Sequence, residues 1–350
     1  MNQLVLNLMS VSGAFAPFRM ANRAKALILT YHRFSHDGAG ETTSTRAFSE
    51  QLDYLTSHYR IVPLSSLAEY LSGSGLLPAS IASIAIDDGY RDAYEIAFPI
   101  LKRYKAPATL FVVTDFVDRK GWLWADKLRY LTRRADLDKI SVTINKGTLA
   151  FMPRRYRSRL EAATQINFAL KLVPDELKEE LILRIAAAFG VELPELPTEE
   201  YRPITWKQAR EMDAGGVQIG SHTVTHPILT RVSDERLRNE LVDSRSRLQA
   251  MLGREVDLFC YPNGDHDQRV SRAVRAAGYK CAVTVEPGLN GAGSDLLRLR
   301  RVHTQNSLAR FIQCTSGFEE IKNRLVYPRR KAAGEIPIYK RGYEQLQQDY

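Results

Sequence analysis

The sequence predicts an α/β protein built on a parallel β-sheet, and closure of that sheet into a barrel fits the pattern. Two observations carry this prediction. About eight short apolar runs recur along the 350 residues, and stretches with helical periodicity separate them. The length suits one α/β barrel with a sizeable insertion. Hydrophobic residues make up 44% and charged residues 25%, which is ordinary for a globular protein with a large core.

Strands and helices are expected to alternate along most of the chain. A helix near Thr45, which can cap it, has an apolar face of Phe48, Leu52 and Leu55. Further helices are predicted at 92–105, 233–252 and 268–277, the second of them stopped by Gly253. The predicted strands are 26–31, 60–63, 84–86, 109–113, 217–220, 257–260, 280–284 and 297–302.

The alternation lapses after Val117, which predicts a mainly helical insertion at about 120–203. A helix at 175–189 begins after Pro174 and ends at Gly190. Residues 129–160 hold nine Lys or Arg against two Asp, so a good part of the positive charge lies here. Two tryptophans, Trp122 and Trp124, either stack on sugar rings or pack the insertion against the barrel. The expected organisation is an N-terminal segment (1–25), a main domain (26–318) and a C-terminal extension (319–350).

The net charge of +9 favours anionic partners such as a membrane surface, an acidic glycan or nucleic acid. No helix-turn-helix, zinc-finger or RNP-type signature accompanies it, so no nucleic-acid partner is expected. The three cysteines form no C-x-x-C pair, which argues against a disulfide framework. The N-terminus lacks Lys and Arg before its apolar stretch and makes a poor signal peptide. A cytoplasmic location is expected, with membrane association through a surface-lying N-terminal helix as the alternative.

Two groups of chemically capable residues follow predicted strands. Asp87 and Asp88 end the run 84–86, where α/β folds gather their sites, although Asp-Gly is also a common turn pair. His222 and His226 follow the run 217–220; a spacing of i and i+4 would place them on one face of a helical turn. Such a pair alone is often a surface accident. Together, two imidazoles and a carboxylate are the donors of an open hydrolytic zinc site.

A third polar segment, Tyr261-Pro262-Asn263-Gly264, also follows a strand. Pro and Gly can hold a sharp turn there, so that a backbone N–H faces a developing oxyanion. This signal is weak alone, because such turns are common.

With these three motifs in this order, the chain resembles the polysaccharide deacetylase family, also called the NodB-homology or carbohydrate esterase family 4 group. The resemblance implies a distorted (β/α) barrel and a divalent metal, Zn²⁺ first and Co²⁺ or Ni²⁺ as alternatives. It implies that Asp87 is the catalytic base and that Asp88, His222 and His226 are metal ligands. Asn263 falls where the family's oxyanion-hole N–H is expected.

Two histidines compete for the role of general acid. Tyr31-His32-Arg33 resembles the exopolysaccharide-deacetylase branch, in which the acid comes from the first strand, so His32 is favoured. His303 is the alternative. Many relatives carry an arginine in the third motif that steadies the catalytic aspartate; here that position is Cys260, and Arg301 is the candidate substitute. Tyr261 is a second candidate for a supporting role.

The expected function is metal-dependent hydrolysis of N-acetyl groups from an N-acetylhexosamine-containing glycan or glycolipid. The alternatives are a hydrolase of a non-sugar amide and a non-catalytic glycan-binding protein on the same fold. The basic insertion, with Arg154, Arg155 and Arg157, is expected to contact an anionic glycan or a membrane surface. The remaining histidines, His36, His58 and His266, match no motif and are expected to be solvated.

Overall fold

The structure is a computed structural model, and it describes residues 2–73, 77–135, 140–144, 147–151 and 156–322. Seven parallel strands form a closed barrel, as predicted. In order around the barrel they are β1 (Leu27–Tyr31), β12 (Leu299–His303), β11 (Cys281–Pro287), β10 (Leu258–Cys260), β9 (Val217–Ser221), β6 (Ala108–Val112) and β5 (Ile81–Ile86). The barrel closes where Leu27 to Tyr31 pair with Ala82 to Ile86.

The eighth predicted strand is also present, but it does not belong to the closed ring. This strand, β4 (Arg60–Ile61), pairs with the start of β5, while β6 pairs with the end of β5. Every residue of β1, β5 and β6 is buried. Such continuous burial explains why these runs are apolar without alternation, since a parallel barrel is covered on its outer face by helices.

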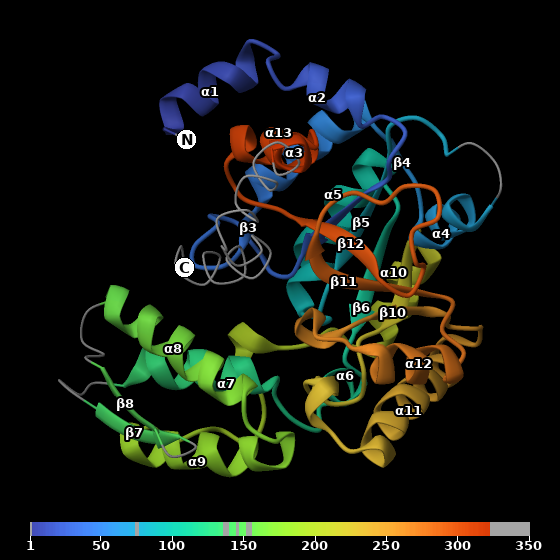
Figure 1. Ribbon diagram of the computed structural model, residues 1–350. Helices are drawn as coiled ribbons and strands as arrows, with labels where there is room; N and C mark the ends of the chain where they lie inside the picture. The colour runs from blue at the N-terminus through green and yellow to red at the C-terminus, as the bar shows by residue number, and fades with distance from the viewer. Residues whose placement is uncertain (1, 74–76, 136–139, 145–146, 152–155, 323–350) are drawn as a thin grey trace, which may run out of the picture.

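Helices cover the outside of the barrel (Figure 1). They are α3 (Thr45–His58), α4 (Leu64–Ser72), the π-helical turn η1 (Ala93–Ala97) with α5 (Phe98–Tyr104), α6 (Thr114–Val117), α10 (Trp206–Ala214), α11 (Asp234–Leu252), α12 (Gln268–Ala276) and α13 (Leu308–Thr315). Ser44, rather than the predicted Thr45, caps α3, because its side chain accepts a hydrogen bond from the Ala47 N–H. Gly253 ends α11 in the left-handed conformation, with φ 70°, as the sequence predicts.

The expected insertion folds around a hydrophobic cluster of its own. It contains α7 (Trp124–Arg134), a hairpin of β7 (Ile140–Ile144) and β8 (Gly147–Phe151), α8 (Tyr156–Lys171) and α9 (Lys178–Phe189), drawn in green in Figure 1. Trp122 and Trp124 are each 7% exposed and belong to this cluster, so their role is packing. The side chains of Arg154, Arg155 and Arg157 lie outside the described residues.

The N-terminal segment forms two short helices, α1 (Gln3–Val11) and α2 (Ala16–Ala21), beside α13. Leu6, Phe15 and Ala309 form the buried centre of this contact. Two short strands, β2 (Phe34–Ser35) and β3 (Thr43–Ser44), pair in the loop that follows β1. Among the helices of the described residues, none is long and apolar enough to cross a membrane.

Candidate active site

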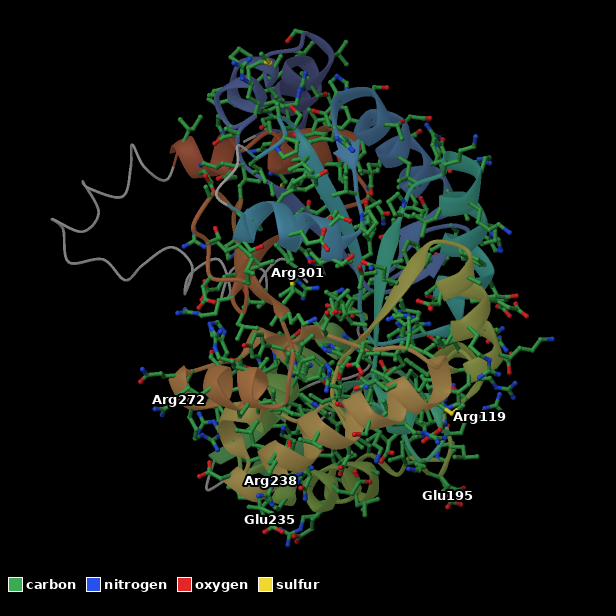
Figure 2. The ribbon with its side chains drawn as sticks, turned by 90° about the vertical axis from the view of Figure 1, so that its right-hand side faces the viewer. Arg119, Glu195, Glu235, Arg238, Arg272 and Arg301 are labelled. Carbon is green, nitrogen blue, oxygen red and sulfur yellow. The ribbon has the colours of Figure 1, made fainter. Side chains whose placement is uncertain are left out.

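The carboxyl ends of five barrel strands bring the predicted site residues together. Because all strands of a parallel barrel point the same way, the residues that follow them meet at one mouth. His32 follows β1, Asp87 and Asp88 follow β5, His222 follows β9, and Cys260 ends β10. Arg301 reaches the same place from within β12. In Figure 2, Arg301 lies in the interior of the molecule, whereas Arg238 and Arg272 lie at the surface.

Asp88, His222 and His226 form one buried cluster. The Asp88 Oδ1 lies 3.5 Å from His222 Nε2 and 3.6 Å from His226 Nε2. One nitrogen from each imidazole and one carboxylate oxygen all lie within 4.8 Å of one another. The three residues are between 2% and 9% exposed. The predicted ligand set therefore converges on one point, which a single cation could occupy.

The two histidines do not share a helical turn, so the expected helical geometry is wrong. Thr223 and His226 both have positive φ, at 72° and 59°, which breaks the helix. The Thr223 hydroxyl accepts a hydrogen bond from the His226 N–H at 3.0 Å and holds the loop in this form. The two rings are still close, edge to face, with centroids 4.7 Å apart. The Thr223 side chain, rather than a helical turn, therefore keeps His222 and His226 close together.

The donor set fits a divalent cation. Nδ1 of His222 lies 2.7 Å from the Cys260 carbonyl oxygen, and a hydrogen bond there leaves the Nε2 lone pair directed at the cluster. Burial and the neighbouring His222 lower the pKa of His226 to about 3, so this ring stays neutral. Burial opposes ionisation of Asp88, but the two histidines outweigh it and hold the pKa of Asp88 below its usual value. His226 and Asp88 are thus in the protonation states that bind a metal. For His222, burial is outweighed by Cys260, Asp88 and Asp87, which raise its pKa, so a bound cation would have to displace a proton from this ring.

Asp87 points to a different set of partners. Its Oδ1 accepts a hydrogen bond from Arg301 Nη1 at 2.8 Å, and both side chains are at most 2% exposed. Its Oδ2 lies 3.6 Å from His32 Nε2 and 3.6 Å from Cys260 Sγ. Burial alone would raise the pKa of Asp87, but the Arg301 guanidinium and His32 outweigh burial and lower it. Adjacent aspartates thus have separate environments.

Arg301, the predicted supporting residue, contacts Asp87. Its Nε donates to the Thr284 carbonyl oxygen at 2.6 Å, so β11 fixes the guanidinium in place. The neighbouring Cys260 occupies the position from which many relatives are expected to supply an arginine. The guanidinium therefore reaches Asp87 from β12 rather than from β10.

Both candidate acids lie at the mouth. The rings of His32 and His303 have centroids 6.1 Å apart, as expected from the pairing of Thr30 with His303 in neighbouring strands. The side chain of His32 is 39% exposed and lies against Asp87. This contact places His32 directly beside the second aspartate.

The third motif forms a tight turn against β11. Asn263 has φ 54°, and the Gly264 N–H donates to the Tyr261 carbonyl oxygen at 2.8 Å. A Cβ on Gly264 would lie 2.3 Å from Val285 Cγ2, so only glycine fits. The Tyr261 hydroxyl donates to the Leu297 carbonyl oxygen at 2.9 Å, which gives Tyr261 a structural contact away from Asp87.

His266, expected to be solvated, is buried behind this turn. Its side chain is 8% exposed. Nδ1 lies 2.9 Å from the Gly264 carbonyl oxygen, and Nε2 accepts a hydrogen bond from Arg298 Nε at 2.8 Å. The prediction was wrong because the partner, Arg298, is distant in sequence. The ring supports the turn that carries Asn263.

A buried network that no sequence motif revealed links the insertion to the mouth. Tyr90, just after the aspartate pair, donates its hydroxyl proton to Asp126 Oδ2 at 2.6 Å, and Asp126 lies on α7. Arg129 donates to the other Asp126 oxygen at 3.0 Å. The Arg33 guanidinium stacks 4.1 Å above the Tyr90 ring and pairs with Asp92 at 2.6 Å. In the sequence, the sign of this network was a charged residue, Asp126, within the otherwise apolar face of α7.

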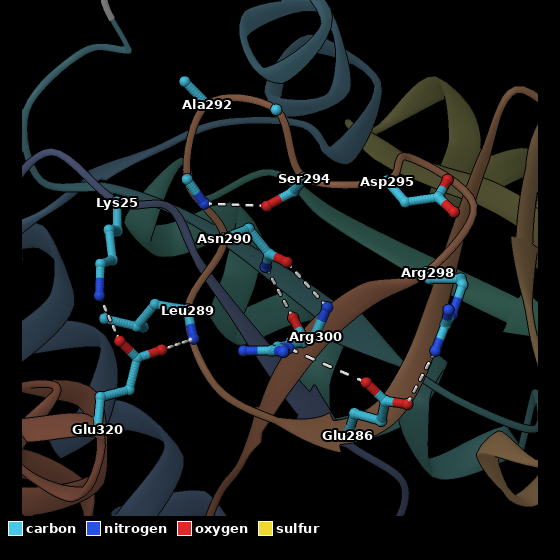
Figure 3. Close-up of a pocket in the computed structure, with 12 residues that line it drawn as sticks. Lys25, Glu286, Leu289, Asn290, Ala292, Ser294, Asp295, Arg298, Arg300 and Glu320 are labelled. Atoms are coloured by element: carbon cyan, nitrogen blue, oxygen red, sulfur yellow. Dashed lines mark hydrogen bonds and ion pairs between the residues drawn. The ribbon is translucent and has the colours of Figure 1, made fainter. Parts of the chain in front are cut away.

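A separate pocket of about 440 Å³ lies beside the connection between β11 and β12 (Figure 3). None of the site residues lines it. Its cations have carboxylate partners of their own: Lys25 pairs with Glu320, and Arg298 lies 3.5 Å from Glu286. This pocket is therefore not part of the barrel-mouth cluster.

Two aspartates and two histidines at the mouth of a parallel barrel are the residue types of a site that could hold a divalent cation for hydrolysis. The sequence model described as "Polysaccharide deacetylase" matches residues 77–282, which is more than half of the chain. The chain therefore belongs to the polysaccharide deacetylase family, the NodB-homology group.

Relatives of known name agree with this assignment. YxkH of Bacillus subtilis, named as a polysaccharide deacetylase, is 21% identical over 287 residues, covering 82% of this chain and 74% of YxkH. The poly-β-1,6-N-acetyl-D-glucosamine N-deacetylase of Staphylococcus aureus is 31% identical over 113 residues, covering 28% of this chain and 39% of that protein.

Solved structures share the fold. The Streptococcus pyogenes deacetylase PplD, in complex with acetate, aligns with a TM-score of 0.57 at 20% identity and covers 83% of this chain and 98% of PplD. IcaB from Ammonifex degensii aligns with a TM-score of 0.55 at 21% identity and covers 83% of this chain and 97% of IcaB.

Proposed function

We propose that this protein is a metal-dependent carbohydrate N-deacetylase that hydrolyses N-acetyl groups on an N-acetylhexosamine-containing polysaccharide, oligosaccharide or glycolipid. The observation that carries the proposal is the buried convergence of Asp88, His222 and His226 beside a second, separately paired aspartate, Asp87. Family membership supports carbohydrate deacetylation as the reaction class. The names of the Staphylococcus aureus relatives favour an N-acetylglucosamine amide as the substrate.

Asp88, His222 and His226 would hold the cation, with Zn²⁺ preferred and Co²⁺ or Ni²⁺ as alternatives. When bound, such a cation polarises a carbonyl group and lowers the pKa of water. Three protein ligands leave room for water and substrate, as catalytic sites require.

The neighbouring side chains would move the protons. Asp87 would accept a proton from the attacking water, since its pair with Arg301 keeps it ionised and oriented. His32 lies 3.6 Å from Asp87 and is partly exposed at the mouth, where it would protonate the leaving amine. The Asn263 backbone N–H would donate to the amide oxygen as negative charge develops on it.

Metal analysis joined to an acetate-release assay tests this proposal. The substrates are N-acetylglucosamine oligomers, other N-acetylated glycans and cyclic amides. We expect one tightly bound divalent cation per chain, and equal amounts of acetate and free amine from a glycan. Chelation should abolish acetate release, and added Zn²⁺ should restore it. Asp87→Asn should keep the metal but lose about 10²–10⁴-fold in kcat.

Each failure points to a definite alternative. Metal-loaded protein that releases no acetate from any N-acetylated glycan would end the proposed substrate class. Turnover of cyclic amides alone would indicate a non-sugar amide hydrolase. Glycan binding without turnover, together with an Asp87→Asn variant that matches the wild type, would indicate a glycan-binding protein on the same fold.

A further inference from the structure

The N-terminal helix α1 presents apolar side chains to solvent. Leu4 is 67%, Leu8 64% and Val11 90% exposed, and Val5 beside them is 45% exposed. Leu4, Leu8 and Val11 are spaced four and three residues apart, so they lie along one face of the helix. We call these four residues the α1 stripe.

The stripe is not the face that holds α1 to the protein. Leu6 is fully buried and packs with Phe15 and Ala309, so the opposite side of α1 already contacts α13. Figure 1 shows α1 and α2 beside α13, well away from α7 and α9 of the insertion. Burial of the stripe therefore needs a partner that leaves the contact with α13 intact.

The charged side chains of the segment that carries the stripe have one sign. Residues 2–36 contain no Asp or Glu, and the helices α1 and α2 are followed closely by Arg23, which is exposed. Arg19 lies within α2 and Lys25 just beyond it. Lys25 pairs with Glu320, which leaves Arg23 as an exposed cation of this segment. An apolar helix face in a segment whose own charged side chains are all cations complements a surface that is apolar within and negative outside.

We infer that the α1 stripe docks into the surface of a lipid bilayer that contains anionic lipids. Apolar side chains would enter the boundary between headgroups and acyl chains, while the exposed Arg23 would contact the headgroups. The helix has nine residues, so it lies on the surface and does not span the membrane.

A second copy of the chain is a poorer occupant. A stable protein interface uses about 20–30 residues on each side, whereas α1 offers four exposed apolar side chains. Residues 323–350 are a poorer occupant too, since they contain six Lys or Arg and three Asp or Glu. A bilayer needs no complementary shape, so a single short stripe is enough for reversible binding.

The amino end of α1 contacts the segment that follows β12, near the mouth of the barrel. The Gln3 side-chain amide donates to the Ser307 hydroxyl at 3.3 Å, and Ser307 caps α13 shortly after the end of β12. Since the mouth is formed at the ends of the strands, a docked α1 would hold it close to the bilayer. Membrane binding itself does not depend on the proposed deacetylation.

Vesicle sedimentation of the full chain tests this inference. We expect the wild-type protein to sediment with vesicles of phosphatidylglycerol and phosphatidylcholine. The double variant Leu8→Gln with Val11→Gln should bind these vesicles about tenfold or more weakly, because it places two amides where two apolar side chains would be buried. Leu183→Gln, at a 54% exposed leucine on α9, is the matched control and should bind like the wild type.

Charge gives an independent arm of the test. Arg23→Glu should weaken binding to the anionic vesicles and leave the weaker binding to pure phosphatidylcholine vesicles unchanged. Unaltered thermal unfolding of the variants would show that the fold is intact.

Two results would overturn the inference. The first is wild-type protein that stays in the supernatant, or a double variant that sediments like the wild type. The second is a dimer, detected by light scattering, that the double variant dissociates, since the stripe would then contact a second copy.

Discussion

The mouth of the barrel and the insertion both bury charged side chains, but the partners come from different distances along the chain. At the mouth, Asp87 pairs with Arg301, which is 214 residues away. In the insertion, the buried Lys178 pairs with Asp175, three residues away, although Asp175 also pairs with Arg236 of α11. The short-range pair lies next to the start of α9, whereas the long-range pair exists only when the barrel has closed.

The two regions meet at Tyr90. Its ring lies under Arg33 from the end of β1, and its hydroxyl contacts Asp126 of α7. The backbone of Tyr90 also forms an isolated bridge with Pro203, near the end of the insertion. We therefore expect substitutions at the mouth to affect the chemistry directly and those in the insertion to affect it through Tyr90.

The largest effect should come from the cluster at the mouth. Asp88→Ala removes one of the three donors and should lower both metal content and acetate release, the latter by about a thousandfold or more. Asp175→Ala, which removes a buried carboxylate from the insertion, is the control and should keep metal and most of the activity. Metal analysis and acetate release measure both. Equal losses of metal and of acetate release in the two variants would contradict the expectation that the mouth, and not the insertion, carries the chemistry.

The second largest effect should be on kcat, and it should distinguish His32 from His303. His32→Gln should lower kcat by about 10²-fold or more, since His32 contacts Asp87 and is the proposed acid. His303→Gln should change kcat by less than about tenfold. Metal content should be unchanged in both variants. The reverse order of the two kcat values would assign the acid to His303.

Arg301 should show a smaller effect with a diagnostic pH dependence. Arg301→Met removes the group that lowers the pKa of Asp87, so that pKa should rise and the acidic limb of the kcat/KM profile should move to higher pH. The variant should also lose about 3–5 kcal/mol of stability, because Asp87 stays buried without its cation. Arg300→Met, at the exposed neighbour, is the control.

For Arg301, the conservative replacement sharpens the result. Arg301→Lys should recover part of the lost activity, since it restores the charge but not the second contact with Thr284. An unshifted pH profile in Arg301→Met would contradict the positioning role.

The smallest effect should come from Asp126, where the insertion meets the mouth. Burial raises the pKa of Asp126, so the folded protein holds this proton at a pH where the unfolded chain, with a pKa of about 3.9, has released it. The contribution of Asp126 to stability therefore falls as the pH rises above about 4. Asp126→Asn should lack this fall and should weaken metal binding by about tenfold or less.

Unfolding curves at several pH values, together with metal titration, measure both consequences of Asp126→Asn. Asp118→Asn, at a partly buried carboxylate that pairs with Arg247, is the control. Arg247 and Trp206 outweigh burial and lower the pKa of Asp118, so its contribution to stability rises with pH, opposite to that of Asp126. An Asp126 variant with the same pH dependence as the wild type would show that this carboxyl group does not couple the two regions.

Local patterns were enough to predict most of the fold. Each of the eight apolar runs forms a strand, and Gly190 and Gly253 end helices where expected. The placement of Asp88 with His222 and His226 was also predicted, since residues that follow parallel strands share one edge. Their roles, and the boundaries of the insertion, remain predictions.

Local patterns failed where a distant partner decides the environment. His266 looks like any surface histidine until Arg298 and the turn at Gly264 enclose it. Asp126 looks like a charge on a surface helix until Tyr90 reaches it. The spacing of His222 and His226 predicted a helical turn, but the Thr223 side chain holds a different loop.

The sequence by itself determined the strands, the helix ends and the kinds of side chain at the mouth, because hydrophobic period and residue chemistry act over a few neighbouring residues. Only the tertiary structure decided that Arg298 meets His266 and that the loop of His222 and His226 is not helical. It also joined β1 to β5 and set Asp126 under Tyr90. Such contacts depend on chain closure and burial, which bring together groups that no local pattern relates.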